Sequence, residues 1–146
     1  MNKNRELIAI LRGLTRDRCV VVSEILIAEG FSKLEVPLNS PNPMETIAEM
    51  QNKFGTSVII GAGTVTNVSE VIELSNLDCQ MIVSPHTDTE VIKTTKNKGM
   101  LSFPGAFTPS ECFSAINSAA DGLKIFPAFK LGVKGFKALK AVLPSN

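Results

Sequence analysis

The segment SVIIGAGTVTNVSEVIELSNLDCQMIV, from Ser57 to Val83, decides the fold class of this chain. It consists of an apolar run at 57–61, a stretch with helical spacing at 67–76 and a second apolar run at 80–83. Strands of a parallel sheet are buried on both faces and read as short apolar runs, and a helix usually connects one to the next. The segment therefore predicts a strand–helix–strand unit.

The same pattern continues toward both ends of the chain. Further strands are predicted at 7–11, 33–36, 100–103 and 123–126. Further helices are predicted at 15–29, 43–54, 87–98, 108–119 and 133–142. Successive strands begin 20 to 26 residues apart, which is the length of one βα unit. The alternation predicts an α/β protein of about six βα units, with a parallel sheet covered by helices.

Several of the predicted helices carry start and stop signals. Thr108 precedes Pro109 and lies three positions before Glu111, which is the pattern of a capping box with proline at the first helical position. The other signals are Thr15 with Asp17, Asn67 with Glu70, and the glycines Gly30 and Gly99 just after helix ends. A glycine there favours a left-handed backbone that ends the helix.

The composition is that of one folded domain. The chain has 146 residues, 44% of them hydrophobic and 20% charged, and its 15 basic residues nearly balance 14 acidic ones. No stretch concentrates one sign of charge, and no apolar run approaches the roughly 18 residues of a membrane span. We therefore expect a single domain over residues 1–146 in the cytoplasm, with neither nucleic acid nor a membrane as partner.

Three cysteines, Cys19, Cys79 and Cys112, are spread along the chain. They form no CxxC pair, and their odd number argues against a disulfide framework or a zinc site. We interpret them as reduced thiols that are part of the core.

Two charged residues interrupt otherwise apolar strands. Glu35 lies between Leu34 and Val36, and Lys124 lies between Leu123 and Ile125. Because side chains alternate along a strand, the apolar neighbours face the helices and the two charges face the opposite, interior side. Two interpretations remain open at this point: a functional pair inside a barrel, or an exposed edge or buried ion pair that only satisfies itself.

Six ordered motifs resemble a known family over essentially the whole chain. They are IAILRG (8–13), LEVPLNSP (34–41), IGAGTV (60–65), IVSP (82–85), FPGAFTPSE (103–111) and GLKIFPA (122–128). Together they resemble the class I 2-keto-3-deoxy-6-phosphogluconate and 6-phosphogalactonate aldolases. The resemblance implies a (β/α)8 barrel of the TIM type, no metal or organic cofactor, and usually a homotrimer. It also implies reversible cleavage of a phosphorylated keto sugar acid to pyruvate and glyceraldehyde 3-phosphate.

By the same resemblance, Lys124 is the lysine that forms a Schiff base and Glu35 is the general acid and base. The chemistry agrees with the sequence pattern. An amine attacks a ketone only when it is unprotonated, and apolar surroundings favour the uncharged form. We expect Leu123, Ile125 and Phe126 to supply those surroundings.

The resemblance also implies a set of substrate-binding residues. They are Arg12, Asn39, Gly63, Thr64, Pro85 and Phe126. Thr64 and Pro85 match positions that line the pyruvate pocket, and Arg12 could bind a carboxylate or phosphate through two hydrogen bonds, unless it is simply a surface arginine. The position of Asn39 typically carries arginine in the gluconate-type enzymes, so this chain looks like the galactonate type.

The chain departs from the family in its length. We expect six βα units where the family has eight, so the strands and loops that commonly hold the substrate phosphate would be missing. The first and sixth strands would then have open edges through which the chain could associate. An inactive truncated fragment, or a remnant that only binds a sugar acid, therefore remains an alternative to an active aldolase.

Two other enzyme classes find little support in the sequence. The segment IGAGTVTN imitates a dinucleotide-binding fingerprint, but Thr66 replaces the third small residue and the next strand ends in Ser84 and Pro85 instead of an acidic residue. His86, the one histidine, has no serine or cysteine arranged with it as a triad. We interpret His86 as a loop or helix-cap residue.

Overall fold

The computed structural model describes residues 6–144, and its strands form one parallel wall. Five of them pair in sequence order: β1 (Ala9–Ile10), β2 (Lys33–Pro37), β3 (Ile59–Gly63), β4 (Met81–Val83) and β5 (Leu101–Phe103). Two more, β6 (Gly105–Ala106) and β7 (Lys124–Ile125), form a second parallel pair. All six predicted strands are present, although β1 is shorter than predicted.

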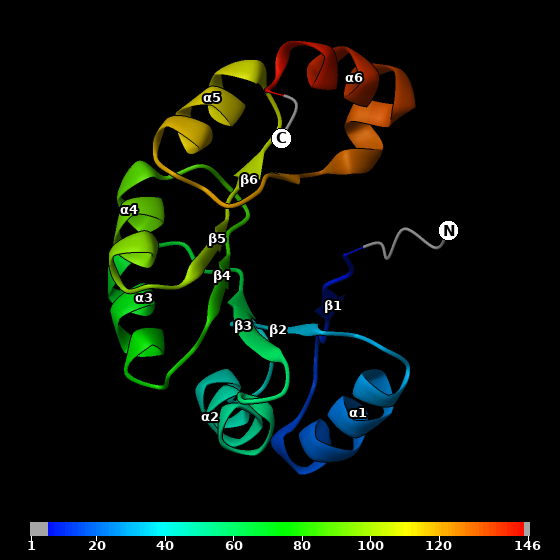
Figure 1. The fold of residues 1–146 in the computed structure, drawn as a ribbon, viewed down its shortest axis with the longest axis vertical. Helices are drawn as coiled ribbons and strands as arrows, with labels where there is room; N and C mark the ends of the chain where they lie inside the picture. Colours follow the sequence, from blue (N-terminus) through cyan, green and yellow to red (C-terminus); the bar gives the residue numbers. More distant parts are fainter. Residues whose placement is uncertain (1–5, 145–146) are drawn as a thin grey trace.

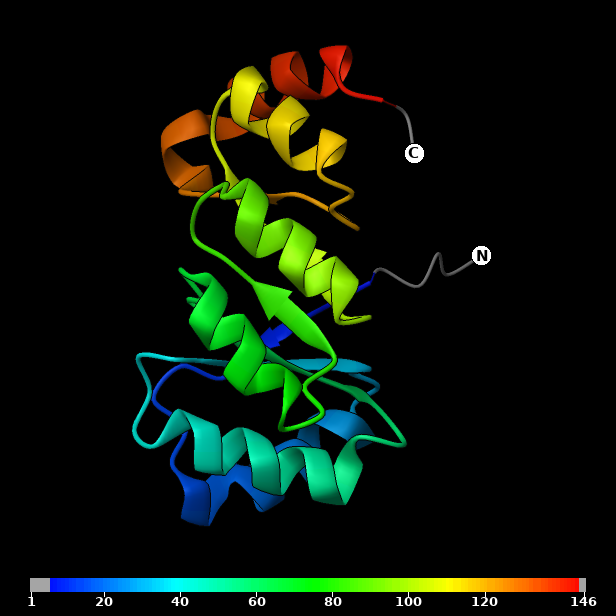
Figure 2. The same ribbon diagram turned by 90° about the vertical axis from the view of Figure 1, so that its left-hand side faces the viewer.

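The helices cover the outer side of this wall. They are α1 (Arg16–Ala28), α2 (Pro43–Phe54), α3 (Val68–Ser75), α4 (Thr89–Asn97), α5 (Pro109–Asn117) and α6 (Ala128–Val142). Figures 1 and 2 show a crescent in which the strands lie on the inner side and the helices on the outer side. The α/β class with parallel strands is thus confirmed. None of the helices described between residues 6 and 144 is long and apolar enough to cross a membrane.

The fifth predicted strand, 100–103, corresponds to β5, and a further strand that was not predicted, β6, follows directly after Pro104. β5 pairs with β4 before the proline, and β6 pairs with β7 after it. Proline has no N–H to donate, so it interrupts the ladder on one side, but its carbonyl oxygen accepts a 2.9 Å bond from the Lys124 N–H. The segment from β5 to β6 therefore joins both sheets into one curved wall.

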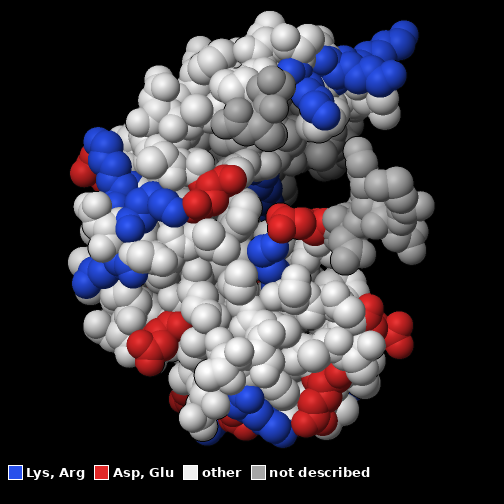
Figure 3. Space-filling model, in the orientation of Figure 1, with Lys and Arg blue, Asp and Glu red and all other residues white. Residues whose placement is uncertain are grey.

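The sixth helix begins earlier than the predicted 133–142. Two helical segments meet at Gly132, whose φ of 65° is left-handed, and this break disturbs the helical period in the sequence. α6 also differs from the rest of the surface in charge. It carries Lys130, Lys134, Lys137 and Lys140 and no acidic residue. Figure 3 shows acidic and basic side chains interspersed over most of this face, with basic ones alone at the α6 end.

The main core lies between the wall and the helices. Leu34 and Val36 of β2 are fully buried there, as the alternation in the sequence predicts. A second cluster lies under α5 and α6, where Leu123 and Ile125 pack against Cys112 and its neighbours. The apolar neighbours of Glu35 thus face the helices, which leaves the opposite face of β2 to the charged residue between them.

All three cysteines are buried and free, which confirms their interpretation as core thiols. Cys79 is 4% exposed, and its thiol points to the carbonyl oxygen of Met81 at 3.5 Å. Burial raises the pKa of the Cys79 thiol to about 11, because a thiolate would lose its hydration there. These thiols therefore act as small hydrophobic groups.

The cap signals have different outcomes. The Thr108 hydroxyl accepts from the Glu111 N–H at 3.3 Å, and the Glu111 carboxylate accepts from the Thr108 N–H at 2.8 Å, so the capping box is confirmed. Asn67 likewise caps α3 by accepting from the Glu70 N–H. Thr15 is the N-cap residue of α1, but its side chain makes no capping bond. Gly30 and Gly99 are left-handed, as expected.

Replacing Thr108 with alanine should lower the free energy of unfolding by about 0.5–2 kcal/mol, because the first turn of α5 loses a hydrogen-bond acceptor. Thr15→Ala is the matched control, since its side chain makes no capping bond and its loss should be smaller. Urea denaturation of both variants measures the difference. Equal losses would mean that the capping bond contributes nothing.

Candidate active site

Glu35 lies in the middle of β2 and points to the inner side of the wall. Glu35 is 1% exposed, and its carboxyl oxygen Oε2 has no hydrogen-bond partner within residues 6–144. A Cβ added at Gly63 on the neighbouring strand would overlap the Glu35 carboxyl group. The missing side chain of Gly63 therefore creates the space that the carboxyl group occupies.

The environment of Glu35 changes its acidity. Burial raises the pKa of the Glu35 carboxyl above its usual value, and the positive charges of Lys124 and Arg12 act in the opposite direction. The effect of burial prevails. A carboxyl group of this kind exchanges its proton closer to neutral pH than an exposed glutamate does, which suits a general acid and base.

Lys124 approaches the same space from the far end of the wall. Its side chain is partly buried, and its Nζ lies 5.0 Å from the centre of the Phe126 ring. Asp121, just before β7, fixes the entry to this strand. Its carboxylate accepts from the Ser102 N–H at 2.8 Å and pairs with Lys96 at 2.6 Å. These bonds attach the segment that carries Lys124 to β5 and α4.

Glu35 and Lys124 line one cavity of about 170 Å³. The other lining residues are Ile8, Ile10, Val83, Phe103 and Leu123. The expectation that both charges face the interior is thus confirmed. The apolar surroundings of Lys124 come mainly from other strands, so the expected role of Ile125 is wrong because that side chain packs outward. The alternation of Ile8 and Ile10 around the buried Ala9 is a sequence signal that could have identified part of this wall.

The predicted substrate-binding residues lie at the carboxyl ends of the strands. In chain order, Arg12 follows β1, Asn39 follows β2, Gly63 ends β3, Thr64 follows it, Pro85 follows β4 and Phe126 follows β7. Because all the strands are parallel, these ends meet at one edge of the wall, where α/β proteins bind ligands. Arg12, Asn39 and Phe126 are exposed, whereas Thr64 and Pro85 are partly buried. Their roles in binding stay predictions.

Thr64 has an unusual backbone. Its φ is 59°, in the left-handed region that β-branched residues rarely adopt. Such a conformation costs of the order of 1–3 kcal/mol and persists only where the surrounding structure imposes it. Here the chain is held on both sides, because the Gly63 carbonyl accepts from Leu38 and the Val65 N–H donates to Val83. This strained residue is one of the predicted substrate-binding residues.

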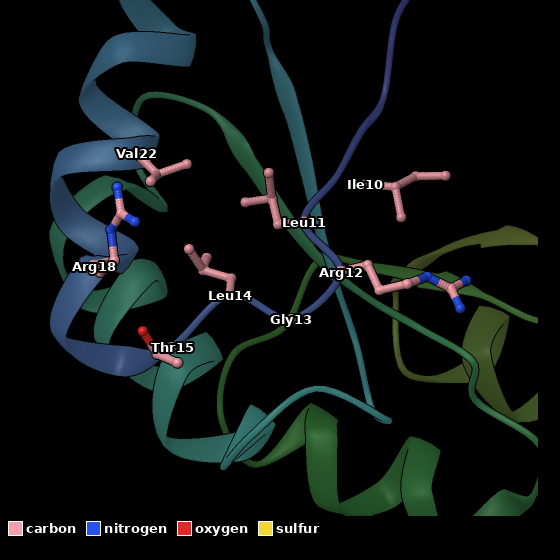
Figure 4. A pocket seen from close by; sticks show the side chains of 8 residues that line it. All are labelled: Ile10, Leu11, Arg12, Gly13, Leu14, Thr15, Arg18 and Val22. Atoms are coloured by element: carbon pink, nitrogen blue, oxygen red, sulfur yellow. The ribbon is translucent and has the colours of Figure 1, made fainter.

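Arg12 and Arg18 flank the first loop but point in different directions. Figure 4 shows the Arg12 guanidinium directed away from α1, whereas Arg18 lies along that helix. A cavity of about 310 Å³ lies between the end of β1 and α1, lined in part by Gly13, Thr15 and Arg18. Arg12 is exposed and also lines this cavity, and its positive charge acts to lower the pKa of Glu35 against the effect of burial.

The features that suggested other enzymes have structural explanations. A Cβ at Gly61 would overlap Met81, and one at Gly63 would overlap Glu35, so both glycines are required by packing within the wall. His86 is exposed in the loop after β4, as predicted. Within residues 6–144, no three His, Cys, Asp or Glu residues are grouped so that they could hold a metal ion.

Comparison with known proteins shows what this chain resembles. The family model described as KDPG and KHG aldolase matches residues 1–145. The 2-dehydro-3-deoxy-6-phosphogalactonate aldolase of Escherichia coli (strain K12) is 43% identical over 96% of this chain and 68% of its own length. A probable 2-dehydro-3-deoxy-6-phosphogalactonate aldolase of Rhizobium meliloti (strain 1021) is 42% identical over 97% of this chain and 67% of its own length.

A solved structure is similar to the same extent. The native KDPGal structure superposes with a TM-score of 0.94 at 41% identity, over 99% of this chain and 70% of that one. This chain thus spans about two thirds of the length of the curated relatives described above. The family match over nearly every residue, the shared fold and the cavity with Glu35 and Lys124 lead to one conclusion: the chain belongs to the KDPG and KHG aldolase family.

Proposed function

We propose that this chain is a class I aldolase that cleaves 2-dehydro-3-deoxy-6-phosphogalactonate or the corresponding gluconate to pyruvate and D-glyceraldehyde 3-phosphate. The observation that carries the proposal is the cavity that Glu35 and Lys124 share on the inner side of the wall. Relatives more than 40% identical are named phosphogalactonate aldolases. Asn39 also favours the galactonate epimer, because it resembles the galactonate type at a position where the gluconate-type enzymes typically carry arginine.

The reaction begins at Lys124. Its uncharged amine attacks the C2 ketone of the substrate, and the resulting carbinolamine loses water to form an iminium. The Glu35 carboxylate then takes the proton of the C4 hydroxyl group. As the C4–O bond becomes a carbonyl, the C3–C4 bond breaks and its electron pair moves into the iminium, which becomes an enamine. The aldehyde product leaves at this stage.

Glu35 then works in the opposite direction. The carboxyl group that holds the proton delivers it to C3 of the enamine. C3 thereby becomes the methyl carbon of pyruvate, and the iminium is restored at C2. Water hydrolyses this iminium and releases pyruvate and the free Lys124. One carboxyl group can serve as base and acid because burial raises its pKa toward the working range.

The proposal also assigns positions around the reacting carbons. Thr64 and the adjoining backbone of Gly63, with Pro85, surround the pyruvate half of the substrate at the ends of β3 and β4. Phe126 lies against the Lys124 side chain, at 5.0 Å from Nζ to ring centre. Arg12, at the carboxyl end of β1, binds an anionic group of the substrate.

Borohydride reduction in the presence of pyruvate should attach a label to Lys124, because only an imine is reduced to a stable amine. Lys124→Arg should abolish the label, since a guanidinium stays protonated and cannot attack a ketone. Lys130→Arg is the matched control and should leave labelling unchanged, because Lys130 is exposed on α6 outside the cavity. Peptide mass mapping locates the adduct. A label on Lys130 or Lys134, or no label at all, would reject the proposal.

Glu35→Gln should keep imine formation while it slows deuterium exchange into the methyl group of pyruvate by about 10²- to 10⁴-fold, because the proton carrier is lost. In the parent chain, the exchange rate should rise with pH as Glu35 loses its proton. The midpoint should lie above the usual range for glutamate, since burial raises the pKa of Glu35. NMR measures both rates. Undiminished exchange in the variant would assign the proton transfer to another group.

The same substitution should change how stability depends on pH. The pKa of Glu35 is higher in the folded than in the unfolded chain. The contribution of Glu35 to the free energy of unfolding is therefore complete below its unfolded pKa, and it is lost as pH rises through its folded pKa. Glu35→Gln should therefore be more stable than the parent at neutral pH and similar to it in acid. Thermal unfolding across pH measures this difference. A constant difference at every pH would contradict the burial of the charge.

A further inference from the structure

The turn that carries Arg12 is closely defined. The Leu11 N–H donates to the Glu35 carbonyl oxygen at 2.8 Å, which continues the pairing of β1 with β2. The Leu14 N–H then donates to the Leu11 carbonyl oxygen at 3.2 Å and closes a turn with Arg12 and Gly13 at its centre. Gly13 has a φ of 75°, as the third residue of a type II turn requires.

Ser40 connects this turn to the next strand. Its hydroxyl oxygen accepts from the Gly13 N–H at 3.1 Å, across 27 positions of sequence. Ser40 is 8% exposed, and its own N–H donates to the Pro37 carbonyl oxygen at 2.9 Å, which fixes the chain just after β2. The hydroxyl group thus joins the loop after β1 to the loop after β2.

Arg12 is therefore held from both sides. The residue before it bonds to β2 through the Glu35 carbonyl oxygen, and the residue after it bonds to the loop after β2 through Ser40. Because the Cα–Cβ bond follows the backbone, these bonds fix the direction in which the Arg12 side chain leaves the turn. Figure 4 shows the guanidinium directed away from α1 and from Arg18.

We propose that Ser40 is a positioning residue, whose hydroxyl group fixes the turn at 11–14 and so holds Arg12 at the carboxyl end of β1, where it binds the anionic group of the substrate. Ser40 itself does not touch the substrate in this arrangement. The inference rests on the proposed function for the role of Arg12 in binding. The placement of Arg12 relative to Glu35 can be measured without any turnover.

The first measurement is the titration of the Glu35 carboxyl group, followed by ¹³C NMR without substrate. Two positive charges, Arg12 and Lys124, lower the pKa of Glu35 against the effect of burial. Ser40→Ala should raise the titration midpoint, because Arg12 would no longer be held near the carboxyl group. Arg12→Ala should raise it as well. In the Arg12→Ala background, Ser40→Ala should have no further effect, since the two residues act as one unit.

The matched control is Ser118→Ala. Ser118 is also 8% exposed and hydrogen-bonded, but its hydroxyl group donates to the Ser114 carbonyl oxygen at the end of α5. The control should leave the Glu35 midpoint unchanged, and Ser40→Thr, which keeps the hydroxyl group, should restore it. An unchanged midpoint in Ser40→Ala, or additive effects of Ser40→Ala and Arg12→Ala, would overturn the positioning role.

Kinetics provide the second measurement. Ser40→Ala should raise KM for the phosphorylated keto acid by roughly 10- to 100-fold, the effect of losing a hydrogen bond to a charged group. Labelling of Lys124 by pyruvate and borohydride should stay at the parent level. A fall in labelling equal to the loss in kcat/KM would overturn the proposal in favour of general damage. If the parent chain itself fails to label, the proposed function is wrong, and the NMR titration alone decides the role of Ser40.

Discussion

The burial of the Glu35 carboxyl group inside the parallel wall is the constraint on which the rest of this structure depends. A carboxylate removed from water loses several kcal/mol of hydration unless charges or donors replace the water. Here Gly63 supplies the space, and the positive charges of Lys124 and Arg12 supply part of the compensation. The remaining penalty is expressed as a raised pKa, which is the property that a residue needs to take up and return a proton.

The wall must bring two strands that are far apart in sequence to one cavity. β2 carries Glu35, and β7 carries Lys124 at the other end of the crescent (Figure 1). The break at Pro104 lets one segment pair with β4 on one side and with β7 on the other. Asp121 then fastens the entry to β7 through Ser102 and Lys96. Curvature of the sheet, rather than any local motif, therefore brings Glu35 and Lys124 to one cavity.

Much of this arrangement could be predicted from local patterns. The six strands and six helices that apolar runs and helical spacing predict are all present in the structure. They could be predicted because burial on a sheet or helix face imposes its period on the sequence. Gly132 concealed the first part of α6, since a left-handed residue breaks that period. Strand β6 was also missed, because a strand of two residues leaves too few positions for any period.

The sequence by itself determined which side chains face inward, because alternation along a strand is a local property of the backbone. It thereby placed Glu35 and Lys124 on the interior face. Only the tertiary structure decided that Val83 and Phe103 would enclose the cavity, that the Glu35 carboxyl would fill the space at Gly63, and that Ser40 would hold Gly13. Each of these contacts joins residues from different βα units, so it depends on strand register and sheet curvature, which no local pattern encodes.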